Sequence, residues 1–75
     1  MLAPHEIRAI EIEATRQTYW QAARETCARL RHHRRMGWDM PWAIESHYRL
    51  LRYYLSRWRA ARDEQLQQHS MGRAA

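Results

Sequence analysis

Two long segments with helical periodicity make up most of the chain, and one short break separates them. When residues are wound at about 100° each, the core-type positions of the second segment fall within about a third of the helical circumference. These positions are Ile44, His47, Tyr48, Leu51, Tyr54, Leu55 and Trp58. The opposite face is polar and holds Glu45, Arg49, Arg52, Ser56, Arg59 and Asp63, while a narrow second apolar line holds Trp42, Tyr53 and Ala60. The pattern predicts one long amphipathic helix.

The first segment has two apolar stripes instead of one. The longer stripe holds Ala9, Ile12, Tyr19, Trp20, Ala23, Cys27 and Leu30. The shorter stripe lies on the far side of the N-terminal half and holds Ala3, Ile7, Ile10 and Ala14. A single partner helix can cover only one of these stripes, so the pattern predicts a further partner for the other.

Proline and glycine mark the ends of the predicted helices. Pro4 suits the first turn of a helix, where its missing N–H costs nothing, and Gly37 is typical of a helix stop. Asp39 can cap a second helix that opens with Pro41 and carries Glu45 in its first turn. We therefore expect a helix at about 4–36, a turn at 37–40, a helix at about 41–68 and a frayed tail at 69–75.

These elements predict an all-α fold with one helical-hairpin domain over residues 1–68. Two helices packed side by side have no third layer, and a chain of 75 residues is short for an independent core. No disulfide can compensate, because Cys27 is the only cysteine. We expect a homodimer in which two hairpins form a four-helix bundle and bury the second stripes between subunits. A helix-swapped or open dimer fits the pattern equally well.

Composition excludes several classes of protein. No apolar run approaches the roughly 18 residues that a membrane span requires, and the N-terminus carries charges where a signal peptide needs an apolar stretch. A single cysteine is typical of a reducing compartment, so we expect a cytoplasmic protein. Two glycines cannot make a glycine-rich phosphate loop, and we expect no small-molecule substrate.

Catalytic and metal-binding patterns are missing from the sequence. Cys27 lies on an apolar stripe, which favours a small buried side chain over a nucleophile. Glu11 and Glu13 point to nearly opposite sides of a helix, so they cannot act as a paired acid and base. His32 and His33 are adjacent and diverge by about 100°, which is poor geometry for one metal ion. We therefore predict no enzyme activity, no metal and no cofactor.

Binding is the function class that the remaining features favour. Net charge is +5 and all thirteen basic residues are arginine, which favours an acidic partner. Tryptophan, tyrosine and arginine are also the residue types enriched at protein–protein hot spots. The predicted protein-binding residues are Trp38, Trp42, Tyr48, Tyr53, Tyr54, Arg34 and Arg35. Trp38 and Trp42 could equally cap the end of a bundle.

Nucleic acid is the alternative partner. An arginine-rich helix face could neutralise phosphates while Trp38 or Tyr53 stacks on exposed bases. The residues predicted for this role are Arg31, Arg49, Arg52 and Arg59. Acidic residues dilute the basic face, and two long helices do not match a helix-turn-helix motif. A membrane-surface role is not expected, because glutamates and glutamines interrupt both helices.

The segment TRQTYWQAARETC at 15–27, followed by an aromatic-rich second helix, resembles a known type of protein. These are the small anti-quorum-sensing and anti-pilus proteins encoded by Pseudomonas phages. The shared features are an aromatic–tryptophan pair, here Tyr19 and Trp20, then a basic–acidic pair, here Arg24 and Glu25. The resemblance covers about a third of the chain, and the strong basic charge departs from it.

The resemblance implies a dimeric helical hairpin that binds host proteins early in infection. The targets it implies are a LuxR-type quorum-sensing activator and the ATPase that drives type IV pilus assembly. Aromatic residues of the second helix contact partners in those proteins, and the matching positions here are Tyr48 and Tyr54. The prediction is a non-enzymatic phage or mobile-element protein that binds and inhibits a host protein. Assembly into a larger structure is a third interpretation, and the sequence does not separate a phage origin from a host origin.

Overall fold

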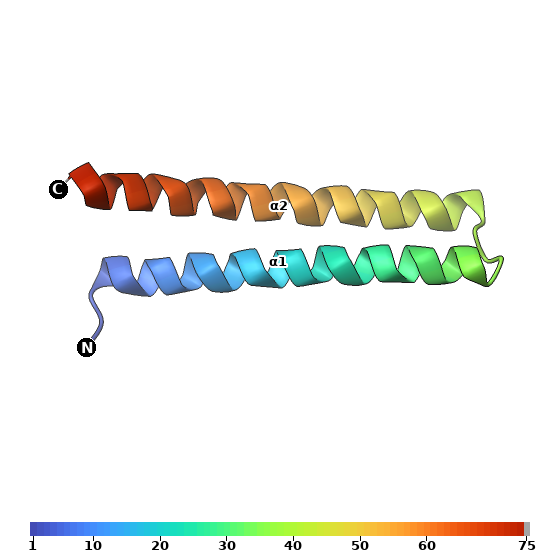
Figure 1. Ribbon diagram of the computed structural model, residues 1–75, viewed down its shortest axis with the longest axis horizontal. Coiled ribbons are helices and arrows are strands. Elements are labelled where there is room, and N and C mark those ends of the chain that lie inside the picture. Colours follow the sequence, from blue (N-terminus) through green and yellow to red (C-terminus); the bar gives the residue numbers. More distant parts are fainter. Residues whose placement is uncertain (75) are drawn as a thin grey trace.

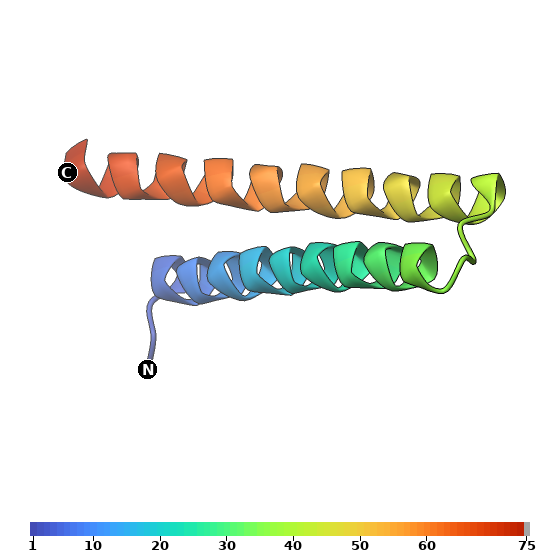
Figure 2. The same ribbon diagram turned by 45° about the vertical axis from the view of Figure 1, so that its right-hand side comes forward.

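Two long helices lie antiparallel and are joined by a tight turn (Figures 1 and 2). The computed structural model describes the backbone of residues 1–74 and the side chains of residues 1–70. Helix α1 is Pro4–Arg35 and helix α2 is Pro41–Ala74. Both chain ends lie at one end of a rod measuring 55 × 22 × 14 Å, and the turn lies at the other. The predicted all-α helical hairpin is confirmed. Helix α2 continues to Ala74, beyond its predicted end at about 68. The predicted fraying of 69–75 stays a prediction, and Ala75 lies outside the described residues.

Backbone hydrogen bonds at both ends of helix α1 explain where it begins and ends. The carbonyl oxygen of Ala3 accepts the N–H groups of Glu6 and Ile7, both at 3.0 Å, and Pro4 takes the first helical position. At the other end the N–H of Trp38 donates to the carbonyl of His33 at 2.8 Å. The N–H of Gly37 donates to the carbonyl of Arg34 at 3.2 Å. These bonds form a Schellman motif around Gly37, whose φ of 71° lies in the left-handed region that glycine tolerates.

The N-cap residue of helix α2 differs from the predicted one, although the helix begins at Pro41 as predicted. The carbonyl of Met40 accepts the N–H groups of Ala43 and Ile44, so Met40 and not Asp39 is the N-cap residue. Pro41 takes the first helical position, as the sequence predicts. The first turn of α2 holds no acidic residue, so the placement of Glu45 there is wrong. Because Pro41 takes the first helical position, the residue directly before it, Met40, becomes the N-cap, and Asp39 lies one residue too early to cap the helix.

The two helices meet along a seam whose positions alternate between spacings of three and four residues. On α1 the seam positions are Ile12, Arg16, Tyr19, Ala23, Thr26, Leu30 and His33. On α2 they are Ile44, His47, Leu51, Tyr54, Trp58, Ala61, Gln65 and Gln68. Every one of these side chains is buried or half-buried. This repeat of 3.5 residues is the spacing of a coiled-coil interface.

Several residues face a different direction from the one predicted. Trp20, Ala9 and Tyr48 were placed in the core stripes, but Trp20 is 44% exposed and the other two are also exposed. Thr26 and Ala61 are buried instead. The hydroxyl of Thr26 donates to the carbonyl of Ala22 at 2.8 Å, which satisfies this polar group inside the seam. Trp20 directly follows the seam residue Tyr19, so its side chain points about 100° away from it, at the margin of the predicted stripe.

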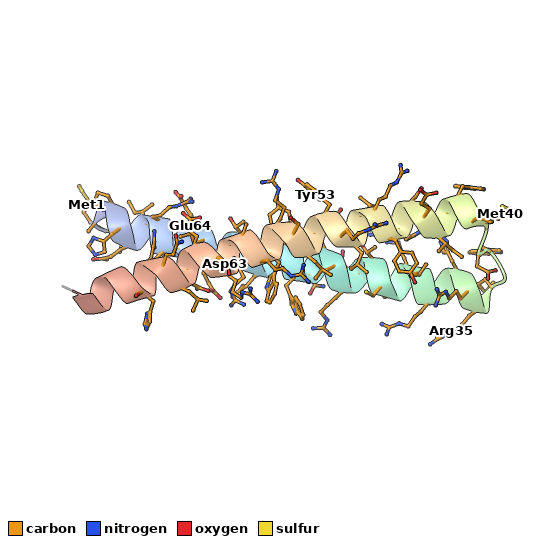
Figure 3. All side chains as sticks on the ribbon, turned by 90° about the horizontal axis from the view of Figure 1, so that it is seen from above. Met1, Arg35, Met40, Tyr53, Asp63 and Glu64 are labelled. Atoms are coloured by element: carbon orange, nitrogen blue, oxygen red, sulfur yellow. The ribbon has the colours of Figure 1, made fainter. Side chains whose placement is uncertain are left out.

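Polar and aromatic contacts bridge the helices along both long edges of the hairpin. On one edge, which we call the tyrosine edge, Tyr19 contacts Tyr53 and Arg8 pairs with Glu64. On the other, the tryptophan edge, Trp20 packs against Trp58 with ring centroids 5.1 Å apart. Figure 3 shows Tyr53 and Arg35 projecting from opposite edges of the hairpin. Among residues 1–70 no further element covers the outer side of either helix, so the buried hydrophobic core of this part is small: Ile12, Ala23, Leu30, Ala43 and Ala61.

Candidate protein-binding surface at the turn

Large apolar side chains gather at the turn end of the hairpin. We call this surface the turn tip; it consists of Met36, Trp38, Met40 and Trp42. These side chains are between 51% and 70% exposed, and Trp42 is the most exposed of them. Figure 3 shows Met40 at the extreme end of the rod. An apolar cluster at the end of a rod, with no packing neighbour beyond it, is typical of a contact surface.

A cluster of three histidines, His32, His33 and His47, packs against Trp38 and between the two helices. The Trp38 ring meets the rings of His32 and His33 edge-on, with centroids 5.6 and 5.8 Å apart. His33 in turn meets His47 of α2 edge-on at 4.8 Å. The cluster therefore joins the last turn of α1, the turn itself and the first turns of α2, and it holds Trp38 in a defined position at the surface.

His33 and His47 are the two inner histidines of the cluster, and the hydrogen bond of His47 identifies its protonated nitrogen. His47 Nδ1 lies 2.6 Å from the carbonyl oxygen of Ala43. A carbonyl oxygen only accepts, so Nδ1 of His47 carries the hydrogen and donates it to Ala43. His33 Nδ1 is buried and has no hydrogen-bond partner among the described residues. Both rings are therefore packed into the hairpin as supporting side chains.

Arginines border the turn tip. Arg34 Nη2 donates to the hydroxyl of Tyr48 at 3.1 Å, which connects the two helices across the tryptophan edge. Arg35 is exposed on the neighbouring turn of α1. The turn tip thus combines exposed aromatic and methionine side chains with fixed positive charge, the composition enriched at the centre of protein interfaces.

The structure divides the predicted protein-binding residues into two groups. Trp38, Trp42, Arg34, Arg35 and Tyr48 lie at or beside the turn. Tyr53 and Tyr54 lie further along α2, where both contact Tyr19 at 6.2 and 6.3 Å between ring centroids. Tyr54 is half-buried in the seam, and Tyr53 lies on the tyrosine edge, away from Arg35. The seven residues therefore do not form one continuous surface, and their role in binding stays a prediction.

Tyr53 lies in its own small cluster of tyrosine and arginine. The guanidinium of Arg57 lies over the Tyr53 ring, 5.4 Å from its centroid. Hydrogen bonding with Tyr19 and the positive charge of Arg57 lower the pKa of Tyr53. The same interaction with Tyr53 raises the pKa of Tyr19. These contacts occupy the tyrosine hydroxyls within the hairpin, which favours a structural role for the cluster.

The arginines predicted for nucleic acid are also brought together only in part. Arg52 and Arg59 flank Leu55 at i−3 and i+4 on the tryptophan edge, and Arg31 approaches the same edge from α1. Arg49 lies elsewhere, because its guanidinium pairs with the Glu45 carboxylate at 2.9 Å. Three of the four predicted arginines therefore share one edge.

A groove on the tryptophan edge is the feature that sequence reasoning missed. The groove is open, has a volume of about 690 Å³, and runs between the middle portions of α1 and α2. Its apolar lining is formed by Trp20, Ala23, Cys27, Ala28, Leu51 and Leu55, and its polar lining by Gln21, Arg24, Glu25 and Arg31. The only signal in the sequence was a tryptophan at the margin of an apolar stripe, and the helical winding placed that side chain in the core.

The described residues hold no cluster of three or more histidine, cysteine, aspartate or glutamate side chains that could bind a metal ion. Cys27 is half-buried in the groove lining and forms no disulfide. In the same part of the chain, neither helix has the length and apolar character that crossing a bilayer requires.

Comparisons with known proteins return no match. No family model, no curated protein and no solved structure is similar to this chain.

Proposed function

We propose that this chain is a non-enzymatic protein-binding module that contacts its partner with the turn tip. The observation that supports the proposal most directly is the exposure of Trp38 and Trp42 beside Arg34 and Arg35. Tryptophan and arginine bury large areas on binding at modest entropic cost, and they dominate the energetics of many interfaces. The histidine cluster beneath Trp38 holds its ring in place before binding, which reduces the ordering cost.

The partner that we propose is a host bacterial protein that the module inhibits by occupying its surface. The support for this class of partner is the resemblance of residues 15–27 to small phage proteins that act in this way. A quorum-sensing activator or a pilus-assembly ATPase is the kind of target that the resemblance implies. The action needs no cofactor, because inhibition by occupancy requires only affinity and a defined contact surface.

Affinity capture with matched variants tests this proposal. We would compare the wild-type chain, a Trp38→Ala/Trp42→Ala variant and a Leu50→Ala control on nuclease-treated bacterial lysate. Leu50 is 41% exposed on α2 and lies away from the turn, so its removal controls for a general loss of apolar surface. Circular dichroism would confirm that each variant is helical.

A host protein that binds the wild type and the Leu50→Ala control, and is lost from the tryptophan variant, supports the proposal. Truncating a single hot-spot tryptophan costs about 2 kcal/mol or more, which corresponds to about 30-fold in affinity. We therefore expect at least a 30-fold loss of affinity from the double variant. Equal capture of one protein by all three chains would show that the turn tip is not the contact surface.

Nucleic acid is the second candidate partner, and one observation favours it. Arg31, Arg52 and Arg59 share the tryptophan edge, and none of them has a carboxylate partner among the described residues. If phosphates bind there, affinity for a single-stranded oligonucleotide falls steeply as salt rises and is lost in an Arg52→Glu/Arg59→Glu variant. Affinity that is independent of salt would exclude this candidate.

A further inference from the structure

One side of α1 carries two unpartnered features that follow each other along the helix. Ile7 and Ile10 are 45% and 57% exposed in the N-terminal half. A continuous line with spacings of three and four residues leads from them to the groove, and its members are Ile10, Ala14, Gln17, Gln21, Arg24, Ala28 and Arg31. The last four of these residues line the groove. The exposed stripe and the groove therefore occupy the two halves of one surface.

The charges on these two halves are opposite. Glu6 flanks the isoleucines along the side of the helix that leads to the tryptophan edge. Glu13 lies on the same side, but Arg16, Gln17 and Gln65 bind its carboxylate within the hairpin, so Glu6 supplies the acidic flank. The groove half instead carries Arg24 and Arg31. Glu25, which also lines the groove, accepts a hydrogen bond from Gln21 at 3.1 Å. The stripe is thus apolar with acidic flanks, and the groove is apolar with basic flanks.

A surface with complementary halves matches a second copy of itself when the two copies run antiparallel. The stripe of one copy then lies on the groove of the other, and the same contact occurs twice around a two-fold axis. The axis passes near Gln17, midway between Ile7 and Cys27. Each copy presents its acidic flank to its partner's arginines, which fixes the direction of the two α1 helices.

We propose that the groove binds the N-terminal half of α1 from a second copy of this chain. In this dimer Ile7 and Ile10 of one copy pack against Trp20, Cys27 and Leu55 of the other. The two α1 helices lie at the centre and the two α2 helices lie outside, which gives a four-helix bundle. A separate acidic partner in the groove would leave the isoleucines exposed, whereas a second copy covers both features. The proposal does not depend on what the turn tip binds.

The native cysteine provides a direct test of this arrangement. Positions 7 and 27 are twenty residues apart on one helix, so about 30 Å separates them within a chain. An Ile7→Cys variant can therefore link to Cys27 only between copies, because a disulfide requires Cα atoms about 4.4–6.8 Å apart. We expect mild oxidation to give a covalent dimer, and peptide mapping to find residue 7 joined to residue 27. Ala3→Cys and Ile10→Cys place the new cysteine on either side of position 7, so comparing the three variants measures the register between the two α1 helices.

Ser56→Cys is the matched control, because Ser56 is exposed on the outer face of α2. We expect little covalent dimer from it under the same conditions. The proposal is overturned if Ser56→Cys links as fast as all three α1 variants, or if those variants link residue 27 to none of positions 3, 7 and 10.

Sedimentation equilibrium on the unmodified chain completes the test. We expect a mass twice the 9.2 kDa of the monomer at micromolar concentration. An Arg24→Glu/Arg31→Glu variant should raise the dissociation constant at least tenfold, whereas Arg29→Glu, on the tyrosine edge, should not. A monomeric wild type overturns the proposal. If that monomer binds a single-stranded oligonucleotide and the Arg24→Glu/Arg31→Glu variant does not, the groove is instead a nucleic-acid site.

Discussion

Two neighbouring alanines on α2 provide a direct test of how the helices face each other. Ala61 is 6% exposed and lies in the seam, whereas Ala60, the preceding residue, is exposed on the tyrosine side. Replacing either with leucine adds the same volume to the same helix. Alanine and leucine are both strong helix formers, so the change in helix propensity is small in both variants.

The expected magnitudes differ because the surroundings differ. An isobutyl group at Ala61 has to fit between two helices that approach closely, next to Trp58 in the same seam. Overpacking of this kind costs about 1–3 kcal/mol. At Ala60 the added carbons project into solvent, and surface substitutions usually change stability by no more than about 0.5 kcal/mol. For a domain of this size, a loss of 1 kcal/mol lowers the Tm by about 4–8 °C.

Urea denaturation followed by circular dichroism measures both variants. We expect Ala61→Leu to lower the midpoint at an unchanged slope, and Ala60→Leu to leave the midpoint close to that of the wild type. Equal midpoints for the two variants would refute the reasoning, and a larger effect at Ala60 would show that α2 is rotated relative to the seam described above. Measurement at two protein concentrations separates effects on folding from effects on association.

Two further predictions follow from single residues. The pKa of Glu13 is lowered to about 2, chiefly by hydrogen bonds from Arg16 and Gln65, so its contribution to stability is present above the ordinary value of 4.5 and is lost as pH falls toward 2. Acid titration of unfolding should therefore be shallower for Glu13→Gln than for the wild type in that window, and identical slopes would contradict the assignment. Gly37→Ala should cost about 1–2 kcal/mol in urea denaturation, because φ is 71° and an added Cβ meets nothing within 4 Å, so only backbone strain opposes it. Gly37→Asn should cost less, since asparagine tolerates the left-handed region, and an asparagine cost equal to that of alanine would argue against this cause.

The helices and the turn could be predicted because their signals are local. Pro4 and Pro41 restrict the backbone at helix starts, and Gly37 permits the left-handed conformation that ends α1. None of these effects depends on distant residues. Asp39 failed as a cap because two effects competed for the same boundary, and the proline position prevailed.

The faces of the helices were predictable only in part. A winding of 100° per residue and the 3.5-residue seam differ by about 20° per heptad, so a stripe drawn over thirty residues drifts away from the true contact line. Ala61 was passed over for this reason. Trp20 was assigned to the core because it lies at the margin of the wide stripe that also holds Tyr19. Small or polar seam residues such as Ala61 and Thr26 also lack the hydrophobicity that a pattern search detects.

Of the two candidate surfaces, one could be predicted from the sequence and the other could not. The turn tip could be found from the sequence, since its tryptophans lie beside the break between two helices. The groove could not, because it exists only when Trp20 and Cys27 of one helix lie beside Leu51 and Leu55 of the other. That placement depends on the register of the two helices, which no local signal specifies.

The antiparallel topology has a consequence for how the chain folds. Contacts across the seam close loops that grow longer with distance from the turn: His33 and His47 are 14 residues apart in sequence (47 − 33), whereas Arg8 and Glu64 are 56 apart. Closing a short loop costs less conformational entropy than closing a long one, so the contacts beside the turn are the least costly to form first. Each pair that forms shortens the loop that the next pair has to close. The hairpin should therefore fold as a zipper from the histidine cluster toward the termini, and the Arg8–Glu64 pair should close last.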